Sequence, residues 1–327
     1  MQKPSMKLRQ YIFRLAISLL VTMLIACSSG PAEKPVSESF SSPASLLDQG
    51  IHNYNINNYA AAINKFEKAL LQYRSIDNQP GIANSCLNLA TAYMAINNNL
   101  IATEYLDRAD AIITQSTLEG LNEHLSLLKS SLAINNGLYD HAVQEIDKVL
   151  DSKDTTIKLA ALKNRTSIAF LRSDNDKLQW LEKYKALQNQ NPDNQSHGAR
   201  ILRFEAEASD DKDKSVTLLT KSLTISQELA NRTAIAATLV QWASLDKDEK
   251  RFKDAEDKYL RALFIRHQLG DVKSSLSILE QLHNIYAATD NDKSAVTKKW
   301  INRLSGNDFS GWELLYTDFD IYPRPDH

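Results

Sequence analysis

Residues 82–109 read IANSCLNLATAYMAINNNLIATEYLDRA, and this stretch decides the fold. Apolar residues recur at spacings of three and four on both sides of the turn signal NNN at Asn97, a pattern typical of two amphipathic helices joined by a short turn. They are Ile82, Cys86, Leu89, Ala90 and Tyr93 before the turn, and Ala102, Leu106 and Ala109 after it. The stretch therefore predicts a helical hairpin.

Similar turn signals, rich in Asn and Asp, recur along the chain at near-regular intervals. They are NINN at Asn55, NNN at Asn97, NNG at Asn135, SDND at Ser173, SDDKD at Ser209, DKDEK at Asp246 and TDND at Thr289. Between Ala44 and Tyr322 the only prolines are Pro80 and Pro192, so little interrupts the helices between the turns. We therefore expect an all-α array of about seven hairpins over residues 46–304.

The hairpins resemble the tetratricopeptide repeat (TPR), in which small residues let two helices cross closely. Matching positions include Gly50, Tyr59, Ala62 and Phe66 in the first hairpin, Leu89, Ala90, Tyr93 and Ala102 in the second, and Trp242, Ala243, Ala255 and Tyr259 in the sixth. The match is weaker in the fourth and fifth hairpins. The resemblance implies a right-handed α-solenoid of about seven TPR-like hairpins with a C-terminal capping segment.

One position in the second helix of each hairpin recurs along the array, and we call its occurrences the phase positions. It falls at Ala62, Ala102, Ala142, Gln179, Ser215, Ala255 and Ala295. The spacing of about 36 to 40 residues exceeds the roughly 34 residues usual for the family, and resembles the long-helix variety found in kinesin light chains and Pins-type adaptors. We expect each of these residues to lie where two helices cross.

Residues 1–26 have the order of features of a secretory signal peptide. Four basic residues, Lys3, Lys7, Arg9 and Arg14, precede the apolar run 15–26, which is too short to span a bilayer comfortably. The run ends in Leu24-Ile25-Ala26-Cys27, which resembles the lipobox of bacterial lipoproteins and implies cleavage before a lipidated Cys27. The alternative is an uncleaved anchor, which would also tether the chain to a membrane.

The residue after Cys27 is Ser28 rather than aspartate, and in bacterial lipoproteins this implies the outer membrane. We therefore expect a lipid-anchored protein that faces the periplasm.

Residues 27–45 are rich in Ser, Pro and Glu, which predicts a flexible linker. Cys86 is the only other cysteine, so no intramolecular disulfide is expected and a buried core thiol is the favoured interpretation.

The composition argues against several classes of function. The formal net charge is −2, with 38 Lys and Arg against 40 Asp and Glu, so no basic excess supports nucleic-acid binding. The histidines are scattered without the spacing of a metal site, and no phosphate-binding glycine loop or catalytic serine motif is present. We expect no cofactor, no metal and no enzymatic activity.

Three amides are the candidate partner-binding residues. In long-pitch TPR proteins an amide just before the Leu of the first helix commonly binds the peptide backbone, and the matching positions here are Asn88, Gln241 and Gln281. An amide both donates and accepts, as an extended backbone requires. The alternative is that these are ordinary solvated polar side chains. Asp48 and Leu128 interrupt the series, so two separate contact regions are expected.

The C-terminal residues 305–327 are unusually rich in aromatic side chains. Candidate contact residues there and in the preceding helix are Trp300, Trp312, Tyr316 and Phe319. The favoured interpretation is a cap that seals the last hairpin, and the alternative is a partner-binding segment.

Two functions remain open on this basis. The first is a membrane-anchored adaptor that binds a protein or peptide partner and localises it in the cell envelope. The second is a self-associating component of an envelope machine, concerned with pili, outer-membrane assembly or peptidoglycan, which forms homo-oligomers through Trp300 and the tail.

Overall fold

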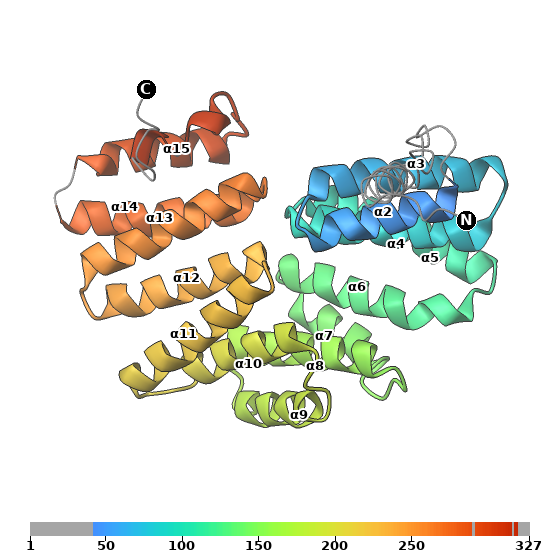
Figure 1. Cartoon of the computed structure of the whole chain (residues 1–327), viewed down its shortest axis with the longest axis horizontal. Coiled ribbons are helices and arrows are strands. Elements are labelled where there is room, and N and C mark those ends of the chain that lie inside the picture. Colours follow the sequence, from blue (N-terminus) through green and yellow to red (C-terminus); the bar gives the residue numbers. More distant parts are fainter. Residues whose placement is uncertain (1–41, 290–291, 316, 320–327) are drawn as a thin grey trace, which may run out of the picture. The chain divides into compact units, whose positions relative to one another are not determined.

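The computed structural model describes residues 42–289, 292–315 and 317–319 (Figure 1). Every regular element among them is a helix, which confirms the predicted all-α class. The α-helices are α2 (Pro43–Asn55), α3 (Tyr59–Ser75), α4 (Gln79–Ala95), α5 (Asn99–Gln115), α6 (Asn122–Asn135), α7 (Tyr139–Asp147), α8 (Thr155–Leu171), α9 (Lys177–Asn189), α10 (Gln195–Glu207), α11 (Lys212–Glu228), α12 (Arg232–Asp248), α13 (Phe252–Gln268), α14 (Val272–Ala288) and α15 (Lys293–Ser305). Short 3-10 helices are η2 (Glu119–Leu121), η3 (Trp312–Leu314) and η4 (Thr317–Phe319).

The predicted signal peptide, residues 1–26, lies outside the described residues, as do Cys27 and Tyr316. The first of the described helices, α2, begins at Pro43, before the expected boundary at residue 46. The reason is local, because Ser42 caps the helix by accepting a hydrogen bond from the Ser45 amide, and proline suits the first helical turn. Within the described part of the chain, no helix is both long and apolar enough to cross a membrane.

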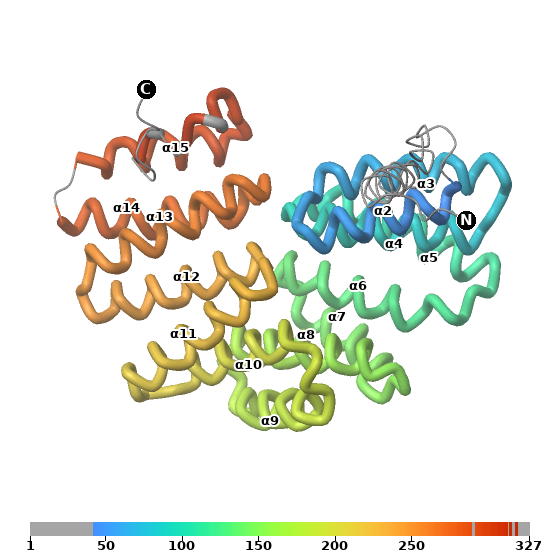
Figure 2. Tube along the Cα trace, viewed as in Figure 1, coloured from blue at the N-terminus to red at the C-terminus, as the bar shows by residue number. Residues whose placement is uncertain are grey.

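Neighbouring helices pack in pairs, and the pairs follow one another in chain order (Figure 2). Each even-numbered helix packs against the odd-numbered helix that follows it, from α2 with α3 to α14 with α15. The even-numbered helices α2 to α12 also contact one another in succession. They therefore form one continuous layer, as expected of a solenoid-like array.

The Asn-rich turns combine two kinds of backbone chemistry. Asn57 and Asn97 adopt left-handed backbone angles, with φ of 60° and 57°, at the ends of α2 and α4. The next residues, Asn58 and Asn98, cap α3 and α5. The side chain of each accepts a hydrogen bond from the backbone amide of the third residue of the helix. Asparagine tolerates the left-handed region and is also a favoured N-cap, which explains why this residue recurs at the predicted turns.

Five of the seven phase positions are buried where the helices cross. Ala62, Ala102, Ala142 and Ala255 are 0% exposed, and Ser215 is 3% exposed. A small side chain at these points lets the two helix axes approach closely. Gly50 meets a similar constraint, since a Cβ atom there would overlap the Phe66 ring on α3.

The other two phase positions, Gln179 and Ala295, are exposed, so the predicted phase is wrong for these hairpins. Helix α9 instead buries Leu181 and Tyr184, and α15 buries Trp300. Each of the two helices therefore buries other residues than the predicted phase position.

Early and late turns of the array contact each other directly. The Asn57 side-chain amide donates to the Ala230 carbonyl at 3.3 Å, and the Tyr59 and Thr233 hydroxyls lie 3.1 Å apart. One hairpin further along, the Asn97 amide donates to the Asp271 carboxylate at 2.5 Å. The turn between α2 and α3 is thus bound to the turn between α11 and α12.

Replacing Ala102 by Phe should destabilise the array. The new ring would have to enter a helix crossing that is already filled, which costs about 1–3 kcal/mol in overpacked cores. Chemical denaturation should therefore show a lower free energy of unfolding. Ala186→Phe, at an exposed position of α9, is the matched control and should change the stability little. Equal stability of the two variants would contradict the crossing assigned to Ala102.

Candidate functional site

An open groove lies between α10, α11 and α12, and we call it the α10–α12 groove. Its volume is about 550 Å³. Apolar side chains in its lining are Phe204, Leu219, Val240 and Leu245, and charged side chains are Arg200, Arg203, Glu207, Lys212 and Asp248. A lining that mixes apolar surface with charges of both signs suits a protein segment as ligand.

Helix α11 turns short polar side chains toward α10. Ser215 and Ser222 are buried, and their hydroxyls donate to the Ala206 and Ala199 carbonyls of α10 at 2.9 and 2.8 Å. These hydrogen bonds satisfy the buried hydroxyls and hold α11 against α10, one wall of the groove.

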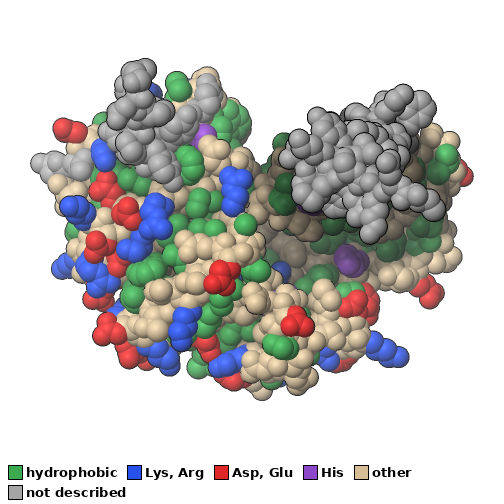
Figure 3. Space-filling view, viewed as in Figure 1, with side chains coloured by type: hydrophobic (Ala, Val, Ile, Leu, Met, Phe, Trp, Pro, Cys, Tyr) green, Lys and Arg blue, Asp and Glu red, His purple; other side chains and the backbone are tan. Residues whose placement is uncertain are grey.

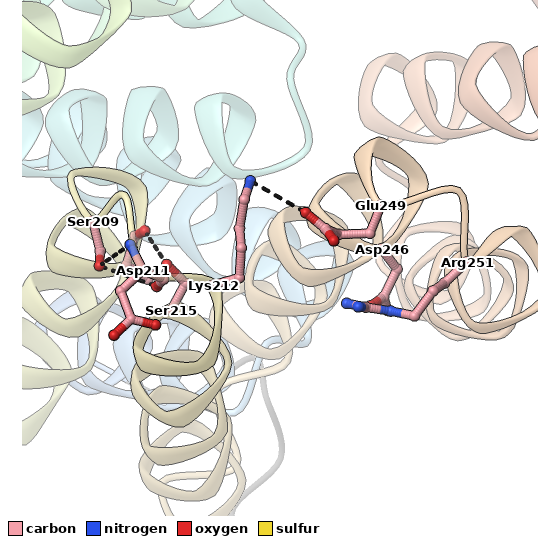
Figure 4. Close-up of polar contacts among 8 residues, drawn as sticks. Ser209, Asp211, Lys212, Ser215, Asp246, Glu249 and Arg251 are labelled. Atoms are coloured by element: carbon pink, nitrogen blue, oxygen red, sulfur yellow. Dashed lines mark hydrogen bonds and ion pairs between the residues drawn. The ribbon is translucent and has the colours of Figure 1, made fainter.

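Polar contacts join the helices beside the groove (Figure 4). Lys212 at the start of α11, which lines the groove, pairs with Glu249 just after α12, with 3.7 Å between nitrogen and oxygen. The buried Asp246 carboxylate pairs with Arg251 at 2.6 Å and with Lys258 at 2.7 Å. The first pair joins α11 to the end of α12, and the other two join α12 to α13 outside the lining of the groove.

Gln241 is the one predicted amide that lines this groove. Its side-chain nitrogen donates to the Arg203 carbonyl at 2.8 Å, which ties α12 to α10. In the described part of the chain the amide oxygen of Gln241 accepts no hydrogen bond. That oxygen is therefore left to accept a hydrogen bond from a ligand.

The structure places the other two amides elsewhere. Asn88 lies on α4 and donates to the Asn84 carbonyl of its own helix at 2.9 Å. Gln281 lies on α14 and accepts a hydrogen bond from the Lys247 ammonium at 2.7 Å. The three amides are consequently not brought together into one site.

The described part of the tail packs back onto the last helices. Trp300 and Phe319 are each 1% exposed, and the Trp300 indole donates to the Asp318 carboxylate at 2.8 Å. Trp312 is partly buried, and its backbone carbonyl lies 2.5 Å from a ring nitrogen of His267 on α13. Neither Trp300 nor Phe319 is accessible to an external partner in this arrangement.

The surface offers neither a strongly charged patch on the face shown in Figure 3 nor an evident metal site. Acidic and basic side chains are intermixed there over the later helices. Among the described residues, no three His, Cys, Asp or Glu side chains gather closely enough to hold a metal ion. Cys86 is buried, and burial raises the pKa of its thiol.

A second cavity lies where the early and late turns of the array meet, and we call it the basic cavity. Its volume is about 740 Å³. Its basic side chains are Lys163 on α8, His197, Arg200 and Arg203 on α10, and Arg266 on α13. The sequence analysis did not identify these residues, because they are distant in sequence and share no local motif. Arg200 and Arg203 also line the α10–α12 groove.

The cations of the basic cavity repel one another. Burial and the nearby Arg200 guanidinium lower the pKa of the Lys163 ammonium to about 8. Arg203 is 7% exposed, and its pKa lies well below the usual value because of burial and of the neighbouring Arg200 and Arg266. Each shift means that the local environment disfavours the positive charge.

His197 is held neutral in this environment. Burial, together with the positive charges of Lys163 and Arg200, lowers its pKa to about 4. A nitrogen of the ring lies 2.5 Å from the Tyr184 hydroxyl on α9, and the two rings meet edge to face. At neutral pH the imidazole therefore acts as a polar group without charge.

Stability should fall as the pH is lowered through the range in which His197 titrates. The folded-state pKa is about 4 and the unfolded-state value is about 6.5, so between these values the unfolded chain binds more protons. Acidification from pH 7 to pH 5 should therefore cost about 1–2 kcal/mol through this residue. Urea denaturation at both pH values should show a smaller loss in His197→Gln.

The exposed His141 on α7 provides the matched control. His141→Gln should lose as much stability on acidification as the unaltered chain. If His197→Gln lost as much as the His141 variant, the neutral imidazole would not be responsible for the pH dependence.

No protein-family model matches the chain, and no curated protein is detectably similar to it. Function is therefore inferred from the groove and the cavity themselves.

Proposed function

We propose that this protein is a non-enzymatic adaptor of a bacterial cell envelope. In this proposal Cys27 is lipidated and anchors the chain in the outer membrane, facing the periplasm. The helical array is a right-handed solenoid of about seven TPR-like hairpins, and it binds a protein or peptide partner. The partner is thereby localised at the membrane.

The observation that carries the proposal is the α10–α12 groove. It is open, its lining combines apolar side chains with charges of both signs, and it includes the Gln241 amide. These features suit a peptide segment, which presents apolar side chains and backbone donors together. Asn88 and Gln281, which lie outside the groove, remain candidates for a second contact region.

The alternative proposal, self-association through the tail, has less support. It requires the aromatic side chains of the tail to reach a second copy. Trp300 and Phe319 are buried within the last hairpin and its cap, so these two side chains would first have to leave their places, and among the large apolar side chains of the described tail Phe309 and Leu314 are exposed. The groove needs no such rearrangement.

Photo-crosslinking tests the groove directly. A photoreactive phenylalanine analogue is placed at Lys212, which lines the groove, in the full chain expressed in a bacterial host. Irradiation followed by purification should yield a defined crosslinked protein. The same analogue at Lys221, an exposed position of α11 outside the groove, should yield none. Equal crosslinking at the two positions would show non-specific contact and contradict the proposal.

Variants of the predicted amides provide a second test of partner binding. The protein is captured from detergent-solubilised membranes, and the crosslinked partner is quantified in the eluate. Gln241→Ala should reduce capture about tenfold, which corresponds to about 1.4 kcal/mol of binding free energy, whereas Gln227→Ala on the exposed face of α11 should not. A loss in the Asn88→Ala, Gln281→Ala double variant would assign a second contact region.

Cys27→Ser should release the protein from the membrane fraction.

A further inference from the structure

The basic cavity has an unusual composition for this chain. The sequence as a whole has slightly more acidic than basic residues, 40 against 38. Among the described residues that line the cavity there are four Lys and Arg side chains but no Asp or Glu. Basic residues from α8, α10 and α13 therefore meet in one place, although nothing in the local sequence brings them together.

Most of this positive charge is not neutralised within the protein. Arg266 pairs with the buried Asp271 carboxylate at 3.1 Å. Lys163, Arg200 and Arg203 form no ion pair with any described residue, although Glu207, which lines the neighbouring groove, favours the positive charge of Arg203. Buried charges are normally paired, because removing them from water is costly. Arg203 is buried and Lys163 and Arg200 are partly buried, and none of the three has an ion-pair partner among the described residues.

One unsatisfied donor accompanies these charges among the described residues. The Nε atom of Arg266 is buried without a hydrogen-bond acceptor. Arg203, which lines the same cavity, is itself only 7% exposed. A buried donor without a partner costs free energy, so the cavity is complete only when something supplies acceptors and negative charge.

We propose that the basic cavity binds a small organic phosphate. A phosphate group presents several oxygens in different directions and carries about two negative charges, so it can accept from cations on α8 and α10 at once. A single carboxylate would leave most of the positive charge unbalanced. Guanidinium groups also pair well with phosphate oxygens through two parallel hydrogen bonds.

The size and the remaining lining favour an organic ester over the free ion. A volume of about 740 Å³ lies in the range of small-molecule sites and far exceeds one phosphate ion. Tyr54 on α2 and Tyr59 on α3 also line the cavity. Their rings offer an apolar surface for the organic part of the ligand. The inference does not depend on the partner-binding role of the groove.

Calorimetry and thermal denaturation of the full chain in detergent test the site. The probes are inorganic phosphate, phenyl phosphate and a glutamate hexapeptide, at constant ionic strength set with chloride. Phenyl phosphate should bind saturably to one site, should raise the melting temperature, and should bind more tightly than inorganic phosphate. Tighter binding of inorganic phosphate would overturn the organic part of the proposal. Saturable binding of the hexapeptide alone would assign the cavity to an acidic protein segment and overturn the proposal.

Lys163→Met separates a ligand-binding role from a structural one. It removes one of the mutually repelling charges, so the unliganded variant should be at least as stable as the unaltered chain, while phenyl phosphate binding should weaken about tenfold or more. Lys221→Met, at an exposed lysine of α11, should bind normally. Arg200→Gln provides a second variant with the same expected loss. Undiminished binding in both cavity variants would overturn the proposal.

Discussion

The array depends on reversing the chain tightly between helices. At the ends of α2 and α4, one asparagine takes up the left-handed conformation that ends a helix, and the next caps the helix that follows. Because the two roles fall on adjacent residues, the connection stays short and the two helices must lie against each other. Short connections in turn require small residues where the helices cross, and Ala62 and Ala102 meet this requirement.

This constraint also explains how much of the fold was predictable. Turn chemistry and apolar spacing are local, so the helical hairpins and the buried alanines could be predicted from the sequence. Gln179 and Ala295 were misplaced because α9 and α15 bury Tyr184 and Trp300 instead, and no local pattern tells which of two residues turns inward. Pro43 was assigned to the linker because proline and serine are common in linkers, whereas here they begin a helix.

The candidate sites were less predictable than the fold. Gln241 could be singled out by its place in the repeat, since the groove follows from the order of consecutive helices. The basic cavity could not, because Lys163, Arg203 and Arg266 come from three different hairpins and the cavity also needs Tyr54 and Tyr59 from the beginning of the array. The sequence gives only an indirect sign of the cavity. Each of these basic residues lies in a strongly helical stretch, but many solvated basic residues do so as well.

The contacts between early and late turns have a consequence for folding. In an open repeat array each unit contacts only its neighbours, so segments can unfold from either end independently. Here Asn57 contacts Ala230 and Asn97 contacts Asp271, pairs separated by 173 and 174 residues. Such contacts form only after most of the chain is ordered, and they slow folding while joining the two ends into one cooperative unit. Deleting hairpins from either end would therefore remove contacts from the other end as well.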